Sequence, residues 1–302
     1  MSYRREEYHT YNGLNFTEQS GIDFGKYETE ELKKLWRKTL DAGMHGIGFS
    51  MYEDGQEPGD IITEAQVERR IKILAPYSKW VRSFSCIDGN EHIPRIAHKH
   101  GMKTLVGSWL SDDKKENEKE IEALIQLAKE GNVDIAAVGN EVLYRNDLTL
   151  EELLGYIKRV KEALPNIPVG YVDAYYEFSR HPELVEVSDI ILSNCYPYWE
   201  GCQIDGALGH MQQMYGQVVD TANGKPIIIT ETGWPSEGGS LKGAHATEEN
   251  AMKYFINTQA WSAKANIDVF YFSSFDESWK TGDEGDIGAF WGLWDKQENL
   301  KF

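Results

Sequence analysis

Eight short apolar runs alternate with helical patterns between residues 46 and 275, and this alternation constrains the fold more than any other feature. The runs are rich in β-branched and aromatic residues and have the length of strands buried on both faces of a parallel sheet. We predict strands at Gly46–Tyr52, Trp80–Cys86, Lys103–Leu110, Asp134–Glu141, Val169–Tyr175, Asp189–Tyr196, Pro226–Glu231 and Asp268–Phe275.

The segments between these strands show the apolar period of helices. Thr149 and Glu152 have the spacing of a capping box at the start of one helix, and Thr63 and Gln66 open another that runs through Leu74. Alternation on this scale predicts an α/β fold, a (β/α)8 TIM barrel rather than an open doubly wound sheet. No glycine-rich phosphate fingerprint follows the first strand, which disfavours a nucleotide-binding fold.

The length of the chain fits one domain. A (β/α)8 barrel needs about 250 residues, so we expect the 302 residues to form a single catalytic domain over residues 1–302. Residues 1–27 show no clear period and are expected to be an irregular lead-in. A helical pattern covers Glu28–Ala42, whereas little helical pattern follows the eighth strand. We therefore expect the first helix to fill the ring position beside that strand.

Two of the predicted strands end in a glutamate. Glu141 ends the fourth run after Gly139 and Asn140, and Glu231 ends the seventh run before the break at Gly233. An unpaired carboxylate costs several kcal/mol to bury, so both are expected at a site rather than in the core. Paired carboxylates hydrolyse glycosides, with retention when they lie about 5 to 5.5 Å apart and with inversion at about 6.5 to 9.5 Å.

Further polar groups stand where strands of such a barrel end, which is where active sites of this fold lie. They are Tyr52, Arg82, Asn140 and Tyr196, with Glu277 just past the last strand. This set fits a sugar site. A cation can keep one carboxylate ionised, and hydroxyl and amide groups can hydrogen-bond the sugar ring.

Charge and cysteine content exclude several classes of partner. The net charge is −18, which argues against nucleic acid and anionic membranes and is compatible with a neutral sugar. Cys86, Cys195 and Cys202 are too few for a disulfide framework, lack zinc-site spacing and are expected to be buried thiols. We expect no metal and no cofactor. No signal is visible, so we expect a secreted or periplasmic protein if a signal was removed and a cytoplasmic one otherwise.

Four motifs resemble glycoside hydrolase family 17, the β-1,3-glucanase family among the retaining (β/α)8 glycosidases. They are VGNEV, NCYPYW, ETGWPS and FDESWK, at residues 138–142, 194–199, 231–236 and 275–280. Thr232 stands where plant members commonly carry Ser, and the first strand contains GFSMY rather than their GVCYG. These departures indicate a microbial branch and leave the preferred chain length open.

The resemblance implies a role for each matched residue. Glu141 would be the acid/base and Glu231 the nucleophile. Asn140 would bond the sugar 2-hydroxyl, and Tyr196 would hydrogen-bond the nucleophile. Glu277 and Lys280 match a family pattern at the sugar site. The implied activity is retaining hydrolysis of β-1,3-glucan. Endo and exo action both remain open, with endo action favoured, and we expect a monomer.

The chemistry requires different environments for the two carboxyls. The acid must stay protonated, so Glu141 needs a pKa raised by apolar walls and by the charge of its partner. The nucleophile must be ionised, so Glu231 needs donors such as Arg82 and Tyr196. Once Glu231 is glycosylated its charge is lost, and Glu141 can then act as a base.

Structural roles remain open for some of these residues. Arg82 could form a structural ion pair, and Glu277 with Lys280 could be a surface pair. Tryptophans near the motifs either stack on sugar or pack in the core or rim: Trp199, Trp234 and Trp291.

Other functions are also open. Transglycosylation uses the same carboxylates, with a sugar hydroxyl replacing water, and differs only in acceptor binding. A non-catalytic barrel that binds glucan is an alternative from another functional class. The presence of both glutamates argues against it. A nucleotide-dependent or metal-dependent barrel enzyme is disfavoured by the lack of ligand clusters.

Overall fold

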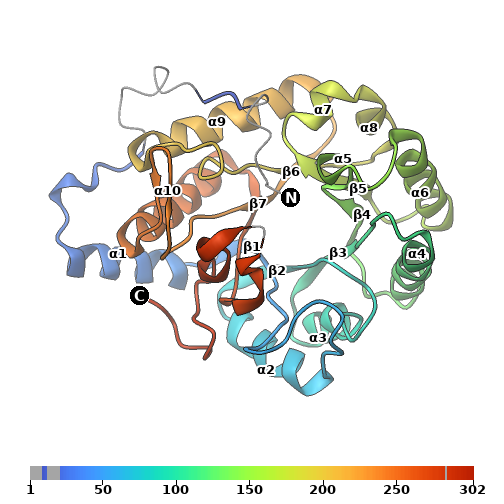
Figure 1. The fold of residues 1–302 in the computed structure, drawn as a ribbon, viewed down its shortest axis with the longest axis horizontal. Coiled ribbons are helices and arrows are strands. Elements are labelled where there is room, and N and C mark those ends of the chain that lie inside the picture. Colours follow the sequence, from blue (N-terminus) through green and yellow to red (C-terminus); the bar gives the residue numbers. More distant parts are fainter. Residues whose placement is uncertain (1–8, 12–20, 283) are drawn as a thin grey trace.

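The computed structural model describes residues 9–11, 21–282 and 284–302. Its centre is a closed barrel of parallel strands in the order β1-β10-β7-β6-β5-β4-β3-β2, with helices around it (Figure 1). The barrel strands are β1 (Met44–Gly48), β2 (Ser78–Ser83), β3 (Lys103–Ser108), β4 (Ile135–Asn140), β5 (Val169–Ala174), β6 (Ile191–Asn194), β7 (Ile227–Thr232) and β10 (Asp268–Tyr271). The predicted (β/α)8 fold is confirmed.

Every predicted strand overlaps an observed one, but the ends differ. The first and the last predicted strands both end early, at Gly48 and Tyr271. Beyond these residues the backbone bonds partly to neighbouring strands, as in the Phe272 N–H to Thr232 O bond at 2.7 Å, and partly to side chains. The N–H of Ser50, for example, donates to Ser274 Oγ at 2.8 Å. The segments that follow β1 and β10 therefore leave the sheet and form part of the barrel mouth.

Helices connect the strands on the outside of the barrel. They are α2 (Glu64–Leu74), α3 (His92–Lys99), α4 (Lys114–Lys129), α5 (Val142–Arg145), α6 (Leu150–Ala163), α7 (Glu177–Arg180), α8 (Pro182–Val187), α9 (Ile204–Thr221) and α10 (Glu248–Ala265). A short hairpin of β8 (Ser240–Leu241) and β9 (Ala244–His245) precedes α10. The capping box predicted at Thr149 and Glu152 is present at the start of α6. Thr63 caps α2 by accepting the N–H of Gln66.

The first helix completes the ring. Only the short 3-10 helices η3 (Ser278–Thr281) and η4 (Gly285–Phe290) follow β10 among the described residues. The helix α1 (Thr29–Asp41) lies beside α10 and close to the C-terminus (Figure 1). Its buried Trp36 packs against Phe255 of α10 and against Phe302, with ring centroids 5.7 and 5.2 Å away. An N-terminal helix thus occupies the place expected for it beside the last strand.

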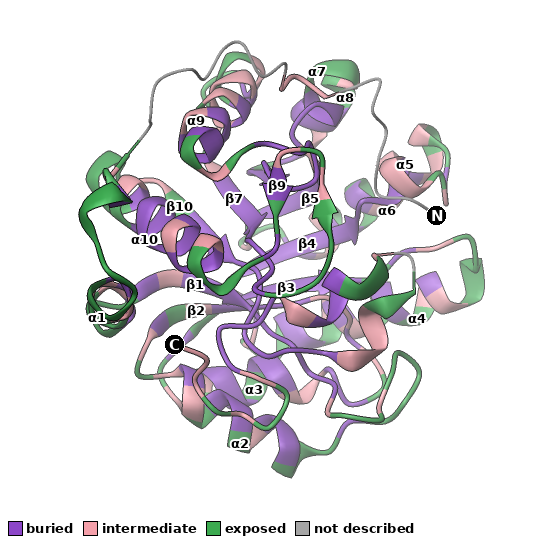
Figure 2. Ribbon diagram, turned by 60° about the vertical axis from the view of Figure 1, so that its left-hand side comes forward, coloured by how far each residue is buried: buried purple, intermediate pink, exposed green. Residues whose placement is uncertain are grey.

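The apolar side chains form two layers, one inside the barrel and one between the barrel and the helices. Burial follows this division, because the strands are buried along most of their length while the helices are exposed on their outer faces (Figure 2). The interior cluster consists of Leu105, Ile135, Ala137, Val172, Ile190, Leu192, Ile228 and Phe270. Side chains alternate along a strand, so the neighbours of these residues point outward to the helices.

Part of the expected lead-in contacts the barrel mouth. Residues 1–8 and 12–20 of it lie outside the described residues. The backbone N–H groups of Thr10 and Tyr11 donate to Glu200 Oε2, each at 3.0 Å. Glu200 is buried and also bonds His210 Nε2 at 2.7 Å. The buried Glu200, which follows β6, therefore holds this piece of the N-terminal segment. That residues 1–302 form one domain stays a prediction.

The three cysteines are buried and free, as predicted. Within the described ranges, no helix is both long and apolar enough to span a bilayer.

Candidate active site

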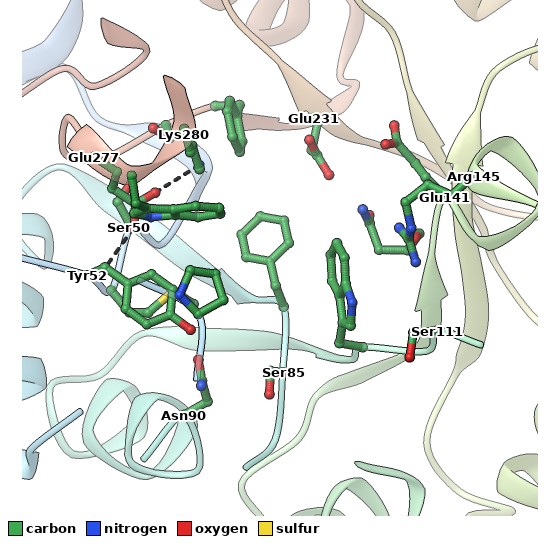
Figure 3. A pocket seen from close by; sticks show the side chains of 18 of the residues that line it. Ser50, Tyr52, Ser85, Asn90, Ser111, Glu141, Arg145, Glu231, Glu277 and Lys280 are labelled. Carbon is green, nitrogen blue, oxygen red and sulfur yellow. Dashed lines mark hydrogen bonds and ion pairs between the residues drawn. The ribbon is translucent and has the colours of Figure 1, made fainter. Parts of the chain in front are cut away.

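A cleft of about 950 Å³ opens where the carboxyl ends of the strands meet. Figure 3 shows Glu141 and Arg145 on one side, Tyr52, Glu277 and Lys280 on the other, and Glu231 between them. The structure brings together most of the predicted site residues along its walls: Tyr52, Asn140, Glu141, Tyr196, Trp199, Glu231, Glu277, Lys280 and Trp291. Arg82 and Trp234 do not line it.

The two glutamates are held close together by one amide. Asn194 at the end of β6 donates through Nδ2 to Glu141 Oε1 at 2.9 Å and to Glu231 Oε1 at 3.1 Å. These two oxygens cannot lie further apart than the sum of the two bonds, about 6 Å, so the two carboxyls are close neighbours. The separation fits retention, in which one carboxylate attacks the sugar directly.

Glu231 lies near the end of β7 among hydrogen-bond donors. Arg82 Nη1 donates to its Oε1 at 2.5 Å, and Tyr196 donates to its Oε2 at 2.8 Å. Arg82 is fully buried and also donates to Asn140 Oδ1 at 2.7 Å. Bonds from a cation and a hydroxyl stabilise the charged form of a carboxylate. Arg82 therefore acts from beneath the cleft floor, as a structural ion pair that also holds two cleft residues.

Glu141 lies in the opposite environment. Burial, followed by the charges of Glu231 and Asp173, raises the pKa of Glu141 to about 8. Its backbone adopts a left-handed conformation with φ of 52°, immediately before α5. Such conformations cost about 1–3 kcal/mol for a residue other than glycine and cluster at functional sites. The turn thus presents a carboxyl with a raised pKa beside a carboxyl that accepts bonds from a cation and a hydroxyl.

Comparisons with known proteins agree with this geometry. The family model described as "BtgE/BtgC glycoside hydrolase domain" matches residues 46–292. The chain belongs to this family. A crystal structure of a glycoside hydrolase family 17 β-1,3-glucanosyltransferase from Rhizomucor miehei is 34% identical, with a TM-score of 0.77, and the match covers 86% of this chain and 96% of that one. The protein is therefore a family 17 member.

Two further relatives carry related names. An active-site mutant of the Rhizomucor miehei enzyme, in complex with laminaritriose, is 33% identical with a TM-score of 0.77, over 86% of this chain and 96% of that one. A protein of Schizosaccharomyces pombe named glucan 1,3-beta-glucosidase is 30% identical over 76% of this chain and 78% of its own length.

Glu277 and Lys280 form an ion pair in the cleft of this family 17 barrel, with Glu277 buried and the Lys280 side chain 13% exposed. Lys280 Nζ lies 2.8 Å from Glu277 Oε2, and the Tyr52 N–H donates to Glu277 Oε1 at 3.2 Å. Burial would lower the pKa of Lys280, but the charges of Glu277 and Glu284 outweigh it and raise the pKa. Both side chains line the cleft, so the alternative of a surface pair is wrong.

The three tryptophans divide between cleft and core. Trp199 and Trp291 line the cleft and contact each other, with ring centroids 5.5 Å apart. Trp234 packs between Tyr198 and Tyr254 and donates through Nε1 to His245 O at 2.9 Å. Sugar stacking by Trp234 is therefore excluded, because its ring is buried in the protein.

Several residues of the site were missed from the sequence. Trp109 lines the cleft, is 36% exposed and lies under the Arg145 guanidinium at 4.3 Å, so it offers a supported aromatic surface to a ligand. Its place near the end of the third predicted strand was the available signal. Asn194 also ends a strand and lies within a quoted motif. Glu284 accepts a bond from Trp291 Nε1 at 3.0 Å, but it lies outside the predicted strands and the four motifs.

Proposed function

We propose that the protein cleaves β-1,3-glucan with retention of anomeric configuration. The observation that carries the proposal is Asn194, whose amide bonds both Glu231 and Glu141 and so holds the two carboxyls close together, while burial raises the pKa of Glu141. The names of the relatives from Schizosaccharomyces pombe and Rhizomucor miehei support a β-1,3-linked substrate.

The reaction proceeds in two displacements. A Glu231 oxygen attacks the anomeric carbon, the glycosidic bond breaks, and the leaving oxygen takes the proton of Glu141. Loss of the charge on Glu231 then removes one cause of the raised pKa of Glu141. Glu141 can accept a proton from water, whose oxygen attacks the anomeric carbon and releases Glu231.

Neighbouring groups support these steps. Burial and the charge of Glu231 raise the pKa of Tyr196 well above its usual range, so its hydroxyl remains a donor to the nucleophile. Arg82 occupies Oδ1 of Asn140, which leaves the NH₂ of that amide to donate to a sugar hydroxyl. We propose that this hydroxyl is the 2-hydroxyl, whose bond would strengthen in the transition state.

Transfer to a sugar hydroxyl is the second candidate function. Both relatives from Rhizomucor miehei are named β-1,3-glucanosyltransferase. The first displacement is identical, and only the acceptor in the second one changes. Binding of an acceptor sugar beside Glu141 would favour transfer over hydrolysis.

A time course of products from a linear β-1,3-glucan, resolved by size, separates these functions. Endo-acting hydrolysis is expected to give a range of intermediate sizes that ends in short oligosaccharides. Release of a single small product from the start would indicate an exo-acting enzyme. Products longer than the substrate would identify a transferase, and binding without any new product would contradict both proposals.

The pH dependence of kcat/KM is expected to show an alkaline limb near pH 8. The acid must be protonated, so activity is lost as the pH rises through the pKa of Glu141, which is about 8. The measurement is kcat/KM for β-1,3-glucan between pH 4 and pH 10, roughly. A limb near pH 4.5, the usual range of a glutamate, would contradict the assignment of a buried, protonated Glu141.

We further propose that the protein acts as a monomer on a neutral glucan. Both carboxylates and the cleft walls described here come from one chain. Size-exclusion chromatography with light scattering tests this proposal. Secretion remains a prediction for expression in the native host to test.

A further inference from the structure

A third carboxyl, Asp173, lies fully buried near Glu141. It belongs to β5, where Val172 points into the barrel, so Asp173 and Tyr171 lie on the outer face of that strand. Asp173 Oδ1 accepts the N–H of Ala174 at 2.7 Å. Its Oδ2 accepts the hydroxyl of Tyr171 and, at 3.4 Å, the N–H of Tyr144. It does not line the cleft, so the steps described above leave it without a role.

The hydrogen bonds around Asp173 are those of an ionised carboxylate. Tyr171 accepts the N–H of Leu143 at 3.0 Å and therefore gives its own proton to Asp173. Both oxygens of Asp173 then act as acceptors, and neither needs a proton. Burial raises the pKa of Asp173 to about 7, so the charge is present in the range around pH 8 where Glu141 titrates.

These bonds hold the turn that presents Glu141. Leu143 and Tyr144 belong to α5, the single helical turn that follows the left-handed Glu141. The first N–H groups of a helix lack partners within it. Here the N–H groups of Leu143 and Tyr144 donate to Tyr171 and Asp173 instead. The pair on β5 thus stabilises a strained backbone at the position of the acid/base.

Charged and titratable groups face Glu141 from several elements. Negative charge comes from Glu231 on β7 and Asp173 on β5, and positive charge from Arg145 on α5. Asn194 on β6 donates to Glu141, and Tyr176, after β5, lies close enough for the charge of Glu141 to raise its pKa. A small cavity of about 50 Å³ beside Glu141 also has His9, Tyr144, Tyr175, Tyr196 and Glu200 in its walls. Asp173 itself faces Glu177 of α7 and Tyr171.

Glycosylation removes one of these charges during the reaction. The charge of Glu231 is present in the free enzyme and absent in the glycosyl-enzyme, whereas that of Asp173 is present in both. We propose, on the basis of the function proposed above, that Asp173 is a positioning residue that holds the turn of Glu141 and supplies the fixed negative charge favouring its protonated form.

The test is the pH profile of the Asp173→Asn variant on β-1,3-glucan. Removal of the charge is expected to move the alkaline limb of kcat/KM to lower pH by about half a unit, which is about threefold in rate on that limb. Turnover of an aryl glucoside with a good leaving group, which needs no acid in the first step, should change little. Asp173→Ser carries the same expectation if the asparagine variant does not fold.

Phe178→Leu is the matched control. Phe178 of α7 is buried against Tyr171, with ring centroids 6.5 Å apart, and carries no charge. We expect a lower Tm and an unchanged alkaline limb. If Asp173 is purely structural, both variants will have a lower Tm and the alkaline limb of kcat/KM will not move in Asp173→Asn. That result would overturn the inference. If the wild-type protein cleaves no β-1,3-glucan, the proposed function fails, and the role of Asp173 falls with it.

Discussion

Glu231→Ala is expected to lower kcat on β-1,3-glucan by at least about 10⁴-fold, because the nucleophile of the first displacement is lost. The cavity left by the carboxylate lies on the face of the sugar opposite the leaving group. Azide is expected to enter it, attack the anomeric carbon and give a glycosyl azide of inverted configuration. The measurement is the rate on glucan and on an activated aryl glucoside, with and without azide.

Glu237→Ala provides the matched control for this experiment. Glu237 is exposed in the loop that follows β7 and does not line the cleft, so the rate of this variant should equal that of the wild type. Equal Tm values would show that both variants fold. Normal turnover by Glu231→Ala, or rescue with a glycosyl azide of retained configuration, would contradict the role of Glu231 as nucleophile.

Glu141→Ala is expected to show an effect that depends on the leaving group. Loss of the general acid should lower kcat/KM on β-1,3-glucan by about 10²–10⁴-fold, because a sugar oxygen leaves poorly without a proton. An aryl glucoside with a good leaving group should still glycosylate Glu231. The glycosyl-enzyme should then accumulate, because no base activates water, and a burst of aryl alcohol measures it.

Azide distinguishes the two glutamates. In Glu141→Ala it attacks the glycosyl-enzyme and should give an azide of retained configuration, opposite to the product of Glu231→Ala. The isosteric Glu141→Gln should behave similarly on glucan, because it keeps the shape and lacks the proton. Equal losses on glucan and on the activated substrate would show that Glu141 is not the acid.

Much of the barrel could be predicted because its signals are local. A strand buried on both faces must be apolar along its length, and a helix start needs a partner for its first N–H groups, as Thr149 and Glu152 show. The fold also follows from the number of alternations, since eight parallel strands can close on themselves. The strand ends were less accurate, because the chain beyond Gly48 bonds to Ser274, more than two hundred residues away.

The catalytic pair was predictable for a related reason. A carboxylate at the end of an apolar strand is too costly to bury without a function or a partner, so Glu141 and Glu231 stood out without any neighbour being known. Trp234 gave the opposite result. Its place in a motif suggested sugar contact, whereas Tyr198 and Tyr254 from other parts of the chain cover its ring. Coverage by distant residues leaves no local pattern.

The sequence by itself determined the eightfold alternation, the two strand-terminal glutamates and the motifs around them, since the signal of each strand, helix and motif lies within a short stretch of the chain. Only the tertiary structure decided that Asn194 joins the two carboxylates, that Arg82 lies beneath them and that Asp173 is close enough to act on Glu141. The physical reason is that hydrogen bonds and charges act through space. Closure of the barrel brings the carboxyl ends of β2, β4, β5, β6 and β7 to one mouth, although most of these strands are far apart along the chain.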